Sequence, residues 1–154
     1  MAHATLLVRY SIPELARRAD EVVVARVESL RYARVEGELV TEYALGIESA
    51  LKGTPARLVW VTQLGGREGN TVRDVVGTVG WLPGDRVLVF LHRDASGRRF
   101  LVGMHQGAFF VVGEALTQRL DASYVDSGGR LVDPRATVVP TLGEVRRLLQ
   151  GGGR

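Results

Sequence analysis

The stretch from Arg86 to Val112 constrains the fold of this chain more than any other segment. Two apolar runs, Val87 to Leu91 and Phe100 to Val102, flank the sequence Asp94-Ala95-Ser96-Gly97, whose residue types favour a tight turn. Both faces of the first run are apolar, which is typical of a strand that is covered on two sides. We therefore predict two strands, a tight turn and a third strand at the centre of the core.

The turn also predicts how the first two strands pair. A four-residue turn places Arg93 opposite Arg98 and His92 opposite Arg99. His105 then lies six residues further along the same strand, roughly 20 Å from His92 at about 3.3 Å per residue. The two histidines are too far apart for a shared metal within this hairpin.

The length and hydropathy of the chain indicate one soluble domain. A chain of 154 residues buries enough apolar surface to fold without a metal or a disulfide. No apolar run approaches the roughly 20 residues of a membrane helix. We expect a single domain over residues 1–150 and a flexible tail at 151–154, where three glycines precede Arg154.

The charge of the chain is weak evidence for nucleic acid binding. The net charge is +3 and the pI is near 9.8, but Lys52 is the only lysine among 20 basic residues. The arginines are spread along the chain and alternate with Glu or Asp, as is typical of solvated strand faces. Cysteine is absent, which excludes disulfides, thiolate metal sites and cysteine nucleophiles.

Capping boxes mark a short helix near each end of the chain. Ser11 and Glu14 have the spacing in which a hydroxyl and a carboxylate satisfy backbone N–H groups reciprocally, and they predict a helix over about 13–19. Thr141 and Glu144 repeat the pattern and predict a helix to about Leu149.

Between the helices the sequence predicts strands. Residues 21–32 and 39–51 alternate apolar and polar side chains around a turn at Glu36-Gly37, and 58–64 follow as another strand. Residues 65–85 are rich in glycine, with a short strand expected at 72–76. This order predicts an all-β fold, an OB-like antiparallel β-barrel with a short helix at each end.

Several of these stretches resemble one known family. The runs Ala19 to Val27 (ADEVVVARV) and Tyr43 to Gly53 (YALGIESALKG) resemble the opening of netrin-type domains, the OB-fold module of tissue inhibitors of metalloproteinases (TIMPs). Pro83 to Leu91 resembles a further shared element. The chain is also similar to uncharacterised domains at the start of exported bacterial proteins, whose GxxQGxF stretch is matched by Gly103 to Phe109.

The resemblance implies a secreted or periplasmic binding module of unknown partner. The TIMPs place an amino-terminal cysteine on the catalytic zinc of their targets, and this chain has no cysteine, so inhibition by that route is in doubt. Ala2-His3-Ala4 has the small-x-small form that ends signal peptides, so we expect a processed, exported chain.

Other chemistry finds little support in the sequence. Asp121, Asp126 and Asp133 lack the spacing of a calcium loop, Ser96 and Ser127 lie in expected turns, and the glycines of 65–69 lack the ending of a phosphate loop. His3 lies near the terminus. We therefore expect no enzymatic activity, no metal and no cofactor.

The glycine-rich loop is the predicted contact surface. Arg67, Arg73 and Trp81 are its expected anchors for a partner protein, because Arg and Trp dominate interface energetics. The alternative is an intracellular OB domain that binds single-stranded nucleic acid through Arg31, Tyr32, Arg34 and Tyr43.

Overall fold

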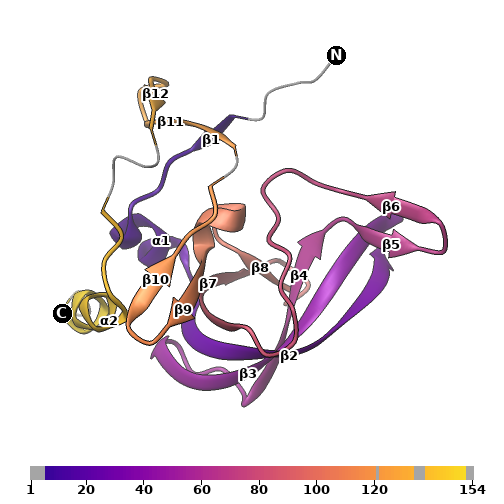
Figure 1. Ribbon diagram of the computed structural model, residues 1–154, viewed down its shortest axis with the longest axis horizontal. Coiled ribbons are helices and arrows are strands. Elements are labelled where there is room, and N and C mark those ends of the chain that lie inside the picture. The colour runs from indigo at the N-terminus through magenta and orange to yellow at the C-terminus, as the bar shows by residue number, and fades with distance from the viewer. Residues whose placement is uncertain (1–5, 121, 134–137, 152–154) are drawn as a thin grey trace.

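The computed structural model of the protein describes residues 6–120, 122–133 and 138–151. The fold is mostly β with two helices, as Figure 1 shows. No helix in these described ranges is long and apolar enough to cross a membrane. Gly151 ends the second helix, and residues 152–154 of the expected tail lie outside the described part of the chain, as do Ala2, His3 and Ala4.

One sheet of seven strands forms the body of the molecule. Its strands follow the spatial order β10-β9-β7-β2-β3-β4-β8, and β8 also pairs with β7. The pairings β7-β2-β3-β4-β8-β7 therefore close a ring of five strands. The bounds of the sheet are β2 Glu21–Val35, β3 Glu38–Lys52, β4 Leu58–Leu64, β7 Arg86–Arg93, β8 Arg99–Leu101, β9 Ala108–Val112 and β10 Ala115–Thr117.

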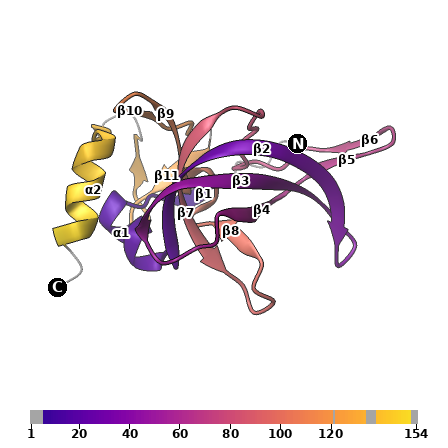
Figure 2. The same cartoon turned by 90° about the horizontal axis from the view of Figure 1, so that it is seen from below.

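The long hairpin of β2 and β3 forms the curved wall of this ring, as Figure 2 shows. Its turn is at Glu36 and Gly37, which both have positive φ, as the sequence predicts. The pairing shifts register at three places in β2, and such bulges bend a strand and increase its twist. Gly46 lies on the bend, where an added Cβ would come within 2.3 Å of the Glu28 carboxylate.

Strand β7 is covered on both faces, which confirms the prediction from its sequence. Val87, Val89 and Leu91 belong to a buried cluster with the side chains of β3, β4 and Trp81. Leu88 and Phe90 belong to a second cluster, which the two helices and β9 cover. Alternation along one strand thus divides the core into two layers.

Both predicted helices form behind their capping boxes. Helix α1 spans Ile12–Arg18, and the Ser11 hydroxyl accepts the Glu14 N–H while the Glu14 carboxylate accepts from the backbone of Ser11. Helix α2 spans Leu142–Gly151, and Thr141 and Glu144 make the same reciprocal contacts.

The hairpin of β7 and β8 has a register one residue away from the predicted one. Arg93 pairs with Arg99 rather than Arg98, and His92 pairs with Phe100 rather than Arg99. The Asp94 carboxylate accepts the N–H groups of Ser96 and Arg98, which extends the turn to five residues. The predicted continuous strand through His105 is also wrong, because a 3-10 helix, η1 (Met104–Gly107), interrupts it.

A smaller sheet joins the N-terminal segment to the later part of the chain. Strand β1 (Leu6–Val8) pairs in parallel with β11 (Ser123–Val125), which pairs with β12 (Leu131–Val132). Gln106 of η1 is buried and fixes this segment: its amide donates to Val8 O at 2.8 Å and accepts the Tyr10 N–H at 2.9 Å. The Gly103 to Phe109 motif therefore has a structural role in this chain.

Candidate functional site

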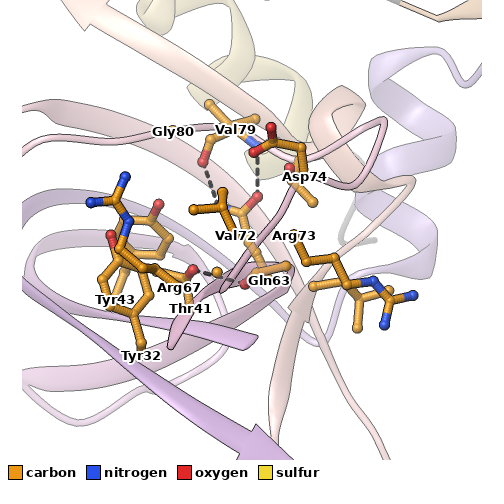
Figure 3. A pocket seen from close by; sticks show the side chains of 14 residues that line it. Tyr32, Thr41, Tyr43, Gln63, Arg67, Val72, Arg73, Asp74, Val79 and Gly80 are labelled. Atoms are coloured by element: carbon orange, nitrogen blue, oxygen red, sulfur yellow. Dashed lines mark hydrogen bonds between the residues drawn. The ribbon is translucent and has the colours of Figure 1, made fainter. Parts of the chain in front are cut away.

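A polar pocket of about 290 Å³ lies beneath the glycine-rich loop, at one end of the strand ring (Figure 3). A small hairpin, β5 (Gly66–Glu68) and β6 (Thr71–Arg73), borders it and projects from the body of the molecule (Figure 1). Strand β6 stands where a strand at 72–76 was expected, and it begins one residue earlier and is shorter. The pocket is lined by Tyr32, Thr41, Tyr43, Gln63, Leu64, Gly65, Gly66, Arg67, Val72, Arg73, Asp74, Thr78, Val79 and Gly80.

Two side chains of the ring hold the loop over the pocket. Gln63 of β4 donates its amide to Val79 O at 2.9 Å and accepts the Val79 N–H at 2.6 Å. Thr41 of β3 donates its hydroxyl to Gly65 O at 2.9 Å. All three contacts are buried, where a lost hydrogen bond is costly, so they fix the loop in place.

Glycine allows the loop to turn tightly beside the ring. Gly65 has a φ of +88°, and a Cβ at this position would come within 2.6 Å of Arg73 O. A Cβ at Gly66 would come within about 3.1 Å of the Tyr32 ring and of Val40 O. The glycine pair therefore brings the β5–β6 hairpin against Tyr32 and shapes one wall of the pocket.

The two predicted arginines have different surroundings. Arg73 forms an ion pair with Glu38 of β3, and its side chain points away from Arg67 in Figure 3. Arg67 lies on the same side of the pocket as Tyr32 and Tyr43, and it has no carboxylate partner among the described residues. Asp74 lies on the opposite side of the pocket from Arg67.

Trp81, the third expected anchor, is buried, and this corrects the prediction. Its side chain is only 2% exposed and packs edge to face on Tyr43, with 4.9 Å between the ring centroids. The turn after Trp81 leads the chain into β7. The indole ring of Trp81 packs in the same buried cluster as the side chains of β7. A side chain with this burial stabilises the wall behind the pocket and does not reach a partner.

The residues of the nucleic acid alternative do not share one surface. Arg31 lies on the opposite face of β2 from Tyr32, because neighbouring residues of a strand alternate. There it pairs with Glu42 at 3.2 Å and lies 4.0 Å from the centroid of the Trp60 ring.

The remaining two residues of that alternative are also engaged. Arg34 binds Glu68 of the hairpin at 2.8 Å. Tyr43 is buried, and burial raises the pKa of its hydroxyl despite a hydrogen bond with the Trp81 backbone. Of the four residues, Tyr32 and Tyr43 meet at the pocket.

The histidines lie in separate environments. His92 stacks on Phe100 at 5.9 Å between centroids, and His105 is buried against the Tyr124 hydroxyl. Within the described ranges, no three His, Asp or Glu residues are grouped so as to hold a metal ion. His3 and Asp121 are outside these ranges, while Asp126 caps a turn by accepting the N–H groups of Gly128 and Arg130.

Sequence reasoning missed the polar floor of the pocket. Thr41 and Gln63 are buried within apolar strand patterns, and a buried polar residue is the signal that could have identified them, but burial is not visible before the strands are paired. Together the fold and the pocket define a small, mostly β protein with a preformed polar pocket beneath one loop. Comparison with protein families, with curated proteins and with solved structures finds no match.

Proposed function

We propose that this protein is a non-enzymatic, extracytoplasmic binding module that contacts another protein at the mouth of the pocket. We further propose that its ring of five strands is an OB-like barrel, since OB folds are built on five strands and bind through loops and one sheet face. The observation that carries the proposal is the exposed rim of the pocket, formed by Tyr32, Arg67 and Val72 over a rigid polar floor.

The chemistry of this rim supports protein binding. Tyr32 is 50% exposed and Val72 is 54% exposed, so the lining of the pocket presents an aromatic and a β-branched side chain to solvent. Tyr and Arg are enriched at the centres of protein interfaces. The buried contacts of Gln63 and Thr41 hold the loop in advance of binding, which lowers the entropic cost of association.

Site-specific photocross-linking in the source cells tests the contact surface. A photoreactive phenylalanine at Val72 is expected to form one discrete adduct with a partner protein. The matched control is Val112, which is 75% exposed at the end of β9, far from the β5–β6 hairpin in Figure 1. Adducts of equal yield at both positions, or none at Val72, would contradict the proposal.

The extracytoplasmic location is supported by the resemblance to domains of exported bacterial proteins, and fractionation of the source cells tests it. The native protein is expected in the envelope or culture fraction. Recovery in the cytoplasm would favour the nucleic acid alternative, which predicts binding of single-stranded DNA that weakens steeply with salt. Absence of binding at low ionic strength would exclude that alternative.

A further inference from the structure

We infer that the pocket recognises a carboxylate of the bound protein, which the guanidinium of Arg67 and the hydroxyl of Tyr32 receive. This inference rests on the proposed function and adds the chemistry of the group that enters the pocket. The carboxylate is either the chain end of the partner or the side chain of an Asp or Glu, and both present the same two oxygens.

The polar groups on the floor of the pocket already bind the loop. The Gln63 amide makes two hydrogen bonds with the backbone of Val79, and the Thr41 hydroxyl donates to Gly65 O. These groups hold the loop and have no remaining donor directed to a ligand, apart from one amide hydrogen of Gln63. The pocket is polar in composition, yet its floor contributes little to recognition.

Two hydrogen-bond donors of the pocket lining, on Arg67 and Tyr32, remain available to a ligand. Neither the Arg67 guanidinium nor the Tyr32 hydroxyl has a hydrogen-bond partner within the described ranges, and both line the same side of the pocket. Arg73 of the same hairpin and Arg34 of β2 are each held by a glutamate. Arg67 thus presents a free planar fork of N–H donors, which matches the two oxygens of a carboxylate.

Charged side chains lie on two sides of the pocket. Asp74 is the acidic residue of the pocket lining, and it lies across the pocket from Arg67. Arg73 also lines the Asp74 side, but Glu38 pairs with it, so among the described residues the unpaired positive charge of the lining is on the side of Arg67. An anionic group is stabilised only on the side of Arg67, which fixes the orientation of the ligand.

The size of the pocket limits the chemical group that can enter it. A volume of about 290 Å³ is just below the range of roughly 300–1,000 Å³ for small-molecule sites. It admits one side chain or one chain end rather than a folded peptide. Val72 and the Tyr32 ring flank the entrance, so an apolar group next to the carboxylate gains contact there.

The test uses small probes of defined charge with the full chain, followed by ¹H–¹⁵N NMR. N-acetyl-leucine carries a free carboxylate and an apolar side chain, and N-acetyl-leucinamide is the matched neutral probe. N-acetyl-aspartate with an amidated chain end presents the side-chain carboxylate instead. We expect N-acetyl-leucine to shift the signals of Gly66, Arg67 and Gly80, and the neutral amide to leave them unchanged; the aspartate probe distinguishes the two sources.

Three variants test the residues. Arg67→Gln is expected to weaken N-acetyl-leucine binding at least about tenfold, the effect of one lost charged hydrogen bond. Arg73→Gln, on the same hairpin but bound to Glu38, is the matched control and is expected to leave binding unchanged. Gly80→Leu is expected to fold, because a Cβ at Gly80 has no atom within 4 Å, and to block binding, because Gly80 lines the pocket.

Equal shifts from the charged and the neutral probe, or equal losses in Arg67→Gln and Arg73→Gln, would overturn the inference. So would binding that survives Gly80→Leu in a folded variant. These results are distinct from failure of the proposed function. A cross-linked partner at Val72 with no response to carboxylates would leave the function standing and remove the inference. Carboxylate binding without a cross-linked partner would remove the proposed function, and with it the assignment of the carboxylate to a bound protein.

Discussion

Gln63 and Val79 are joined by two reciprocal hydrogen bonds, in which the side-chain amide of one residue pairs with the backbone N–H and C=O of the other. This is the geometry of a β-bridge made by a side chain. It anchors a loop that has no ladder of its own at this point to strand β4, and it closes the pocket from below. The shape of the candidate site therefore depends on this glutamine together with Thr41.

Replacing this glutamine is expected to loosen the loop. Gln63→Leu keeps the approximate volume but leaves the buried N–H and C=O of Val79 without partners, which costs about 2–3 kcal/mol. Urea unfolding measures the loss, and hydrogen exchange should show faster exchange of the Val79 amide. The control Gln150→Leu, on an exposed position of α2, is expected to change stability by less than about 0.5 kcal/mol.

Glu21 should contribute to the pH dependence of stability. The residue is 1% exposed, and its carboxylate accepts from Arg99 at 2.6 Å and from Arg93 at 3.1 Å. Burial alone would raise its pKa, but the hydrogen bonds and charges of the two arginines outweigh burial and lower the pKa of Glu21 in the folded protein. The folded state is therefore stabilised above the unfolded pKa of about 4.3, and this stabilisation is lost as pH falls through the lower folded pKa.

Denaturant titrations at a series of pH values measure this contribution. Glu21→Gln is expected to cost about 2 kcal/mol at pH 7 and to flatten the decline of stability below about pH 5. Glu36→Gln, in the exposed β2–β3 turn, is the control and should retain the decline. An unchanged acid limb in Glu21→Gln would show that other carboxylates carry it.

Gly107 is expected to tolerate no side chain. A Cβ there would come within 2.3 Å of Val102 O, and backbone atoms cannot move aside cheaply. Gly107→Ala should therefore lower the unfolding free energy by at least about 2 kcal/mol. Gly80→Ala, which meets open space, should leave stability unchanged or raise it by up to about 1 kcal/mol through the unfolded state. Equal effects in the two variants would contradict the packing at Gly107.

Gln106 is expected to hold the N-terminal segment. Gln106→Leu removes the donor to Val8 O and the acceptor for the Tyr10 N–H, and should cost about 2–3 kcal/mol. The amide of Arg9, which donates to Val125 O at 2.8 Å across β1 and β11, should then exchange faster with solvent. Unchanged protection at Arg9 would show that strand pairing alone fixes β1.

Local patterns predicted most of the elements. The capping boxes at Ser11 and Thr141 mark the starts of α1 and α2, and the turn at Glu36-Gly37 joins β2 to β3. Each depends on residues within a few positions of one another, so local sequence suffices. The hairpin after β7 shows the limit, because the Asp94 side chain added one residue to the turn and shifted the register.

The candidate site was predicted only in part. Arg67 and Tyr32 were both identified, although as members of competing hypotheses, and the structure brings them to one pocket. Trp81 was predicted as an anchor because tryptophan dominates interface energetics, whereas its ring packs on Tyr43, a residue distant in sequence. Burial of a loop residue depends on such distant contacts, which a sequence pattern does not report.

The sequence by itself determined the long strands β2 and β3, the starts of the two helices and the covering of β7 on both faces, because side-chain alternation and capping are local properties of the chain. Only the tertiary structure decided that Tyr32, Gln63 and Arg67 meet around one cavity. Their meeting requires β2, β3 and β4 to pair in one register and the loop to dock on Gln63. Those long-range contacts are selected by packing of the whole core, to which no single segment has access.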